Sequence, residues 1–130
     1  MKLICIPPDQ VETFWPSTWK YILTALSNVG LTEVLDIRKR LANAEALLWV
    51  ATDGTCIAGA GVTELVTSYN QKICDIVAWS TDSHNNALLK TIEDFARAEG
   101  CSKVRLIGRK GWAKRLPEFK LKAVIMEKAL

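Results

Sequence analysis

An almost fully apolar segment, followed by a polar loop and an amphipathic helix, constrains the fold of this 130-residue chain most strongly. Residues 73–79 offer little polar surface, which is typical of a central strand buried on both faces. After the loop at residues 80–85, apolar residues recur at helical spacing up to Gly100, a residue type that often ends helices. Another strand is expected at 103–107. A strand, a helix and a strand in this order predict an α/β layer.

The rest of the chain adds elements to both ends of this unit. Further strands are predicted at 2–6, 47–51, 55–66 and 119–127, and further helices at 11–26, 32–43 and 112–116. The turn Asp53-Gly54 joins two of these strands into a hairpin. Gly59 and Gly61 inside the hairpin indicate a bulge or a close backbone approach. The order β-α-α-β-β-β-α-β-α-β predicts an α/β fold: a mixed sheet flanked by helices, in one domain over residues 1–130.

Composition favours a soluble intracellular chain. Hydrophobic residues make up 49% and charged residues 24% of the sequence, and no apolar run approaches the ~20 residues of a membrane span. The first residues are apolar only until Pro7-Pro8, so we expect no signal peptide and a cytoplasmic location. Four scattered cysteines and a single histidine predict neither a zinc site nor a disulfide framework. We interpret Cys74 and Cys101 as small buried hydrophobic residues.

The charge is unevenly distributed along the chain. Residues 1–102 carry a net charge of −4, whereas residues 103–130 carry +7. Such a basic end either forms a solvated face or attracts a phosphate group, a nucleic acid or an acidic protein. Five tryptophans are many for this length, and we expect them to pack in the core rather than to stack on bases.

This order of elements resembles the GNAT fold of the acyl-CoA-dependent N-acetyltransferases over nearly the whole chain. The resemblance rests on the hairpin at 47–66, the helix that begins Ala87-Leu88-Leu89, and Gly100-Cys101 before the next strand. The segment 107–112, followed by Leu116-Pro117, is also similar to small phage and prophage GNAT-like proteins. The resemblance implies acetyl-CoA as cofactor, lying where the central strand parts from the strand after the long helix, around Ala78. Its pyrophosphate would bind the backbone amides that open that helix.

The pyrophosphate loop departs from the family pattern. The family reads Gln/Arg-x-x-Gly-x-Gly/Ala there, and these positions fall on Ser80, Ser83 and Asn85. Glycine lets a backbone approach phosphate closely, so the loop is degenerate for this purpose. Asp82 adds a negative charge, and Asp82, Ser83 and Asn85 are alternatively interpreted as helix caps. The resemblance implies the following cofactor-binding candidates: Ala78, Ser80, Thr81, Ser83, Asn85, Asn86, Lys110 and Lys114.

Three side chains are candidate catalytic groups for acetyl transfer, which needs an acceptor amine freed of its proton. They are Glu64 late in the hairpin, Asp75 on the central strand and His84 in the loop, although each is also interpretable as a solvent-facing residue. The tyrosine that the family uses as an acid falls at Lys114, and the chain has only Tyr21 and Tyr69.

Two functions follow from these observations. The first is an acyl-CoA-dependent N-acetyltransferase. The alternative is a catalytically inactive GNAT-fold structural or interaction protein that is encoded by a phage. Such a protein would be located in the host cytoplasm or in the virion. The alternative protein would bind a protein or polyanionic partner, or its own copies, through the tryptophan-rich and basic regions. Nucleic acid is a weaker candidate partner, and neither a membrane nor a metal is expected.

Overall fold

The computed structural model describes residues 1–26, 31–82, 86–108, 112–123 and 126–130. The described strands form one mixed sheet in the order β1-β2-β3-β4-β5. These strands are β1 (Lys2–Ile6), β2 (Leu47–Thr52), β3 (Ile57–Ser68), β4 (Gln71–Thr81) and β5 (Lys103–Leu106). The helices are α1 (Val11–Ala25), α2 (Leu31–Ala42), α3 (Leu89–Ala98) and α4 (Trp112–Arg115). Short 3₁₀ turns, η1 (Pro8–Gln10) and η2 (Asn86–Leu88), precede α1 and α3.

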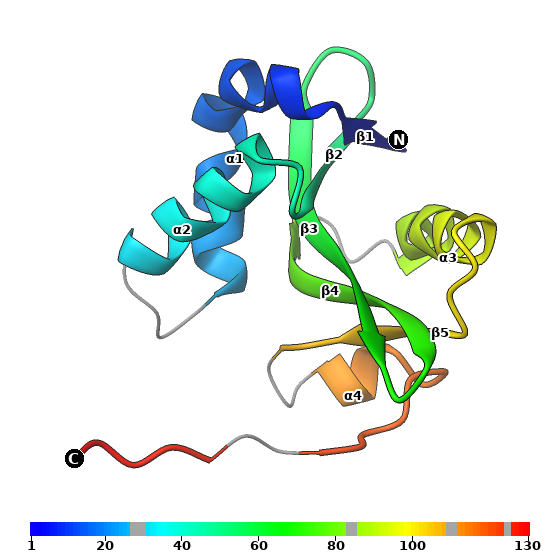
Figure 1. Cartoon of the computed structure of the whole chain (residues 1–130). Helices are drawn as coiled ribbons and strands as arrows, with labels where there is room; N and C mark the ends of the chain where they lie inside the picture. The colour runs from blue at the N-terminus through cyan, green and yellow to red at the C-terminus, as the bar shows by residue number, and fades with distance from the viewer. Residues whose placement is uncertain (27–30, 83–85, 109–111, 124–125) are drawn as a thin grey trace.

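Helices cover both faces of the sheet, with α1 and α2 on one face and α3 on the other (Figure 1). Alternate residues of β2 supply both cores: Leu48 packs on the α1–α2 side, and Trp49 packs on the α3 side. Ile22 of α1 and Ile92 of α3 are both fully buried. Because both faces are covered, the central strands are apolar along most of their length, as the sequence predicted.

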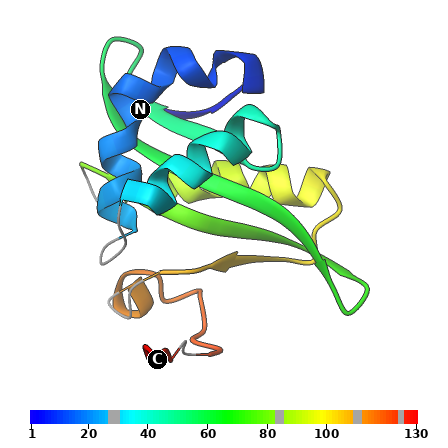
Figure 2. The same ribbon diagram turned by 60° about the vertical axis from the view of Figure 1, so that its left-hand side comes forward.

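The first four strands are antiparallel neighbours, and β4 and β5 are parallel. The parallel pair is connected through α3, which packs back onto the sheet (Figure 2). The α/β class and the mixed sheet are therefore confirmed. In the described part of the chain, no helix is both long and apolar enough to cross a membrane.

The hairpin turn between β2 and β3 is stabilised by one carboxylate. Gly54 has a positive φ of 100°, a conformation that glycine adopts without steric cost. Asp53 Oδ1 accepts hydrogen bonds from the backbone nitrogens of Cys56 at 2.9 Å and Thr55 at 2.8 Å. These backbone donors, together with the Thr55 hydroxyl, lower the pKa of Asp53 to about 2.

The glycines of β3 lie where the backbone of β4 comes close. A Cβ at Gly59 would lie 2.7 Å from the carbonyl oxygen of Ser80, and one at Gly61 would lie 2.7 Å from the ring of Trp79. The prediction of a close backbone approach is therefore confirmed at Gly59, whereas at Gly61 the nearest group is a side chain and the backbone oxygen of Ala78 would lie 3.2 Å away.

The strand predicted at 119–127 is wrong for the residues that the structure describes. After Arg115 these residues form no strand, and Leu121 and Met126 are exposed to 61% and 88%. The alternating pattern indicates a strand only if a neighbouring strand supplies hydrogen bonds and a core covers one face. Among the described residues no strand pairs with this segment, and although Phe119 packs against the α3 core, residues 120–123 and 126–130 are exposed. Figure 1 shows the C-terminus far from the sheet. Val124 and Ile125 lie outside the described residues.

Candidate functional site

The candidate site begins where β4 and β5 part. Their parallel pairing ends at Ile76 opposite Leu106, followed by a hydrogen bond of 3.1 Å from the Ile107 nitrogen to the Ile76 oxygen. β4 continues to Thr81 with β3 on one side, and within the described residues no strand pairs with its other side there. The strands thus part just before Ala78, close to the position that the family resemblance implied.

A bulge in β4 lies at the same point. Val62 of β3 pairs with Ala78, but the next residue, Thr63, pairs with Ile76, which leaves Val77 as an extra residue. Val77 and Ala78 consequently both pack against the α1–α2 core, whereas Ile76 packs on the α3 side. A bulge bends its strand, so the local geometry helps β4 to diverge from β5.

Two of the candidate bases, Glu64 and Asp75, lie side by side next to this bulge. They are partners in the β3–β4 register, so their side chains share one face of the sheet. That face is opposite α3, because the neighbours Cys74 and Ile76 point into the α3 core. Both carboxylates are nearly buried, with 13% of the Glu64 side chain and 7% of the Asp75 side chain exposed.

Arginines from two other elements pair with these carboxylates. Arg105 of β5 donates to both oxygens of Asp75, from Nε at 2.7 Å and from Nη2 at 2.8 Å. Arg40 of α2 forms an ion pair with Oε1 of Glu64 and lies 4.0 Å from the carboxylate of Glu45. Hydrogen bonding to these carboxylates raises the pKa of each arginine, so both remain charged.

The two carboxylates differ in how their oxygens are paired. Asp75 is held at both oxygens in a bidentate pair with Arg105, which fixes its geometry. At Glu64 the described ion pair with Arg40 involves Oε1 alone. Glu64 is therefore the better candidate for a general base, and Asp75 is better suited to positioning Arg105.

The start of the predicted pyrophosphate loop is tied to α1. The nitrogen of Asp82 donates to the Ala58 oxygen at 2.8 Å, and the Tyr21 hydroxyl donates to Oδ2 of Asp82 at 2.9 Å. Burial and the contact with Asp82 raise the pKa of Tyr21. The described side-chain partner of Asp82 is Tyr21. Its interpretation as a helix cap stays a prediction, because the residues between Asp82 and η2 lie outside the described part of the chain.

The other predicted cofactor residues are only partly described. Ala78 is buried, Ser80 and Thr81 are half-buried at the end of β4, and Asn86 opens η2. Lys114 is exposed on α4. Ser83, His84, Asn85 and Lys110 lie outside the described residues.

Sequence reasoning did not assign a role at this site to Arg40, Arg105 or Tyr21. Each contacts its partner across at least 24 positions of sequence, so local patterns could not find the pairing. One signal was present: Asp75 is a charged residue within an apolar strand, and a buried carboxylate requires a partner.

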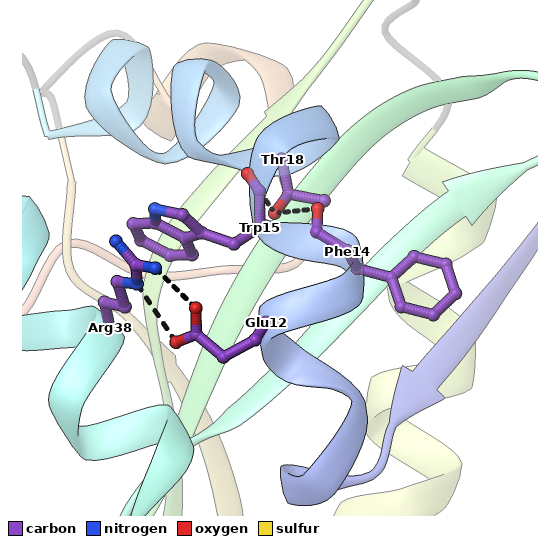
Figure 3. A network of polar contacts seen from close by, with 5 residues as sticks. All are labelled: Glu12, Phe14, Trp15, Thr18 and Arg38. Carbon is purple, nitrogen blue, oxygen red and sulfur yellow. Dashed lines mark hydrogen bonds and ion pairs between the residues drawn. The ribbon is translucent and has the colours of Figure 1, made fainter.

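An apolar groove lies away from these carboxylates, between α1 and α2. Its volume is about 410 Å³, and it is lined by Trp15, Pro16, Trp19, Val34 and Leu35. At its rim the guanidinium of Arg38 lies over the Trp15 ring and pairs with Glu12 (Figure 3). The expectation that the tryptophans pack in the core is confirmed for Trp15, Trp49 and Trp79, whereas Trp19 and Trp112 are half-buried.

The cysteines give no sign of nucleophilic chemistry. Cys74 is fully buried, and burial raises its pKa to about 11, so its thiol is protonated near neutral pH. Its interpretation as a small buried hydrophobic residue is confirmed, whereas Cys101 is only half-buried. The described residues also contain no group of three or more His, Cys, Asp or Glu side chains arranged to hold a metal ion.

Comparison with known proteins identifies the fold. No model of a known protein family and no curated protein matches the sequence. Solved structures do match. An aminoglycoside acetyltransferase from an uncultured soil metagenomic sample, in complex with sisomicin, is 14% identical with a TM-score of 0.73, covering 99% of this chain and 95% of its own.

Two further structures match over similar lengths. A GCN5-related N-acetyltransferase from Ralstonia eutropha is 15% identical with a TM-score of 0.70, covering 99% of this chain and 97% of its own. A predicted acetyltransferase from Clostridium acetobutylicum, solved with acetyl-CoA, is 12% identical with a TM-score of 0.66, covering 99% of this chain and 94% of its own. This chain therefore has the GNAT fold of the acetyltransferases.

Proposed function

We propose that this protein is an acyl-CoA-dependent N-acetyltransferase. The observation that carries the proposal is the parting of β4 from β5 immediately beside the paired carboxylates Glu64 and Asp75. The GNAT fold of the matching acetyltransferases supports it, as does the presence of acetyl-CoA in one of them.

The residues at the parting point fit an extended ligand such as the pantetheine arm of acetyl-CoA. β4 runs five residues beyond Ile76, and on the side away from β3 these residues have no strand neighbour in the described structure. An extended chain can hydrogen-bond to such a strand edge. Ser80, Thr81 and Asn86 would lie at its phosphate end, together with Ser83 and Asn85, and Lys110 and Lys114 would supply positive charge.

When bound, acetyl-CoA supplies a thioester whose acetyl group can pass to an amine nitrogen. Glu64 would accept the proton of the acceptor ammonium group, which frees the nitrogen lone pair to attack the carbonyl carbon. Over the whole transfer the carbon–nitrogen bond would form as the carbon–sulfur bond breaks, and the nitrogen would lose two protons. Glu64 would take the first and release it to solvent, and the second would go to the departing sulfur. His84 is a second candidate for proton transfer in the loop.

Thermal melting with acetyl-CoA tests the cofactor. A ligand that binds only the folded state raises the melting midpoint in proportion to its concentration and affinity. We expect a rise of several degrees at millimolar acetyl-CoA. An unchanged midpoint would contradict the proposal and would favour the alternative, an inactive GNAT-fold protein that binds a partner.

The substitution Glu64→Gln tests the base. It keeps the shape of the side chain and removes its ability to take a proton, so we expect kcat to fall by about 10²–10⁴-fold at neutral pH. The acetyl-CoA-dependent shift of the midpoint should remain. Glu33→Gln is a matched control, because Glu33 is exposed in the first turn of α2, and its kcat should be unchanged.

A further inference from the structure

Arg105 is the charged group that stands out next to the parting strands. Its side chain is 47% exposed, although its partner Asp75 is nearly buried. The pairing uses Nε and Nη2 of the guanidinium. A guanidinium has five N–H donors, so further donors on Nη1 and Nη2 remain for another acceptor. A buried carboxylate that fixes an exposed guanidinium pre-organises it to bind an anion.

The position of Arg105 places this guanidinium beside the candidate base. Asp75 pairs in register with Glu64 on β3 and with Arg105 on β5. The three side chains therefore lie in a row on one face of the sheet. The pairing of β4 with β5 ends one position further along, at Ile76.

A second cation lies on the same face of β5. Lys103 and Arg105 are both exposed, whereas Val104 and Leu106 alternate with them and pack in the α3 core. Residues two apart on a strand point to the same face and lie about 7 Å apart. Lys103 has no ion pair among those described, so its charge is available beside that of Arg105.

We infer that the acceptor is a primary amine that also carries an oxyanion group, a carboxylate or a phosphate, and that Arg105 binds this group. The inference rests on the proposed acetyl transfer and specifies its substrate class. Arg105 would hold the oxyanion while the amine of the same molecule reaches Glu64. Lys103 adds attraction for the anion, and it disfavours amines that carry several positive charges.

Matched pairs of acceptors test the substrate class. We would compare L-alanine with L-alanine methyl ester, and O-phosphoethanolamine with ethanolamine, with spermidine as a polycationic probe. The anionic member of at least one pair should have a kcat/KM at least about tenfold higher than its neutral partner, since hydrogen bonds to charged groups are strong. The pair that shows the difference distinguishes carboxylate from phosphate. Equal values within both pairs, or preference for spermidine, would overturn the inference.

Variants of Arg105 test the residue. Arg105→Gln should abolish the difference in kcat/KM between the anionic acceptor and its neutral partner. The main cause should be a higher KM for the anionic acceptor. Arg105→Lys keeps the charge opposite Asp75 in case the first variant does not fold, and should retain only part of the difference. Arg97→Gln is the matched control, because Arg97 is an exposed arginine that pairs with Asp94 on α3. Its acceptor preference should equal that of the unmodified chain.

Direct binding separates this inference from the proposed function. Calorimetric titration of L-alanine and O-phosphoethanolamine is done with and without acetyl-CoA. If acetyl-CoA does not bind, the transferase proposal fails. Saturable binding of an anionic amine that is lost in Arg105→Gln and kept in Arg97→Gln would still establish the anion site. Absence of saturable binding for both amines under both conditions would overturn it.

Discussion

The close approach of β4 limits which residue types fit at single positions of β3. At Gly59 a Cβ would lie 2.6 Å from Thr81 Cγ2 and 2.7 Å from the Ser80 carbonyl oxygen. The oxygen belongs to a paired backbone and cannot move without disturbing the ladder between β3 and β4. The sequence alone predicted a bulge or a close backbone approach at Gly59 and Gly61. It did not show which atoms of β4 come close.

The substitution Gly59→Ala should therefore destabilise the fold. We expect the free energy of unfolding to fall by about 1–3 kcal/mol, as for other overpacked positions. Urea denaturation measures the change. Thr67→Ala, at an exposed position of the same strand, is the control and should change stability by less than about 0.5 kcal/mol. An equally small effect at Gly59 would contradict the close approach.

Because of Asp53, the free energy of unfolding of the chain should decrease as the pH falls into the acid range. Its pKa is lowered from 3.8 to about 2 in the folded state, so the charged form favours folding. This contribution is complete above pH 4 and is lost as the pH falls towards 2. Asp53→Asn should thus be less stable than the unmodified chain at pH 6, with the gap closing between pH 4 and 2. Urea denaturation at several pH values measures it, and a gap that is independent of pH would contradict this origin.

At the scale of elements, the periodicity of apolar residues predicted the helices α1, α2 and α3 and the strands β1 to β5. It did so because each helix buries one apolar stripe and the strands bury one or both faces in the cores. It failed for residues 119–127, where the pattern is present but no neighbouring strand is described. The parting of β4 and β5 was predictable only through the family resemblance. The pairing of Arg40 with Glu64, and of Arg105 with Asp75, depends on register and helix placement, which local patterns do not encode.

The C-terminal segment gives an element-scale prediction. Leu116 is buried, and Phe119 packs against the α3 core, but Leu121 and Met126 are exposed. A chain ending at Lys120 should consequently lose less than about 1 kcal/mol of stability, because little apolar surface is exposed by the deletion. Thermal and urea denaturation of the shortened chain measure this. A much larger loss would mean that residues 121–130 pair with the sheet as the sequence pattern suggested.

At the scale of the whole molecule, one sheet serves two cores. Leu48 and Trp49 of β2 are consecutive residues, yet they belong to opposite cores. A strand cannot lose one face and keep the other ordered, since its residues alternate along a single backbone. The two cores should therefore unfold together, and the carboxylate row next to the bulge should be stable only while both are formed.

Shortening one buried side chain in either core tests this cooperativity. Ile22→Ala on α1 and Ile92→Ala on α3 remove fully buried side chains from opposite faces, and each should cost about 2–5 kcal/mol. Tryptophans lie in both cores, so fluorescence reports on both, while far-ultraviolet circular dichroism reports on the backbone. In each variant the two transitions should coincide. Leu35→Ala, at a half-exposed position on α2, should shift the midpoint little. Separate transitions for the two probes would show that one face of the sheet can stay folded without the other.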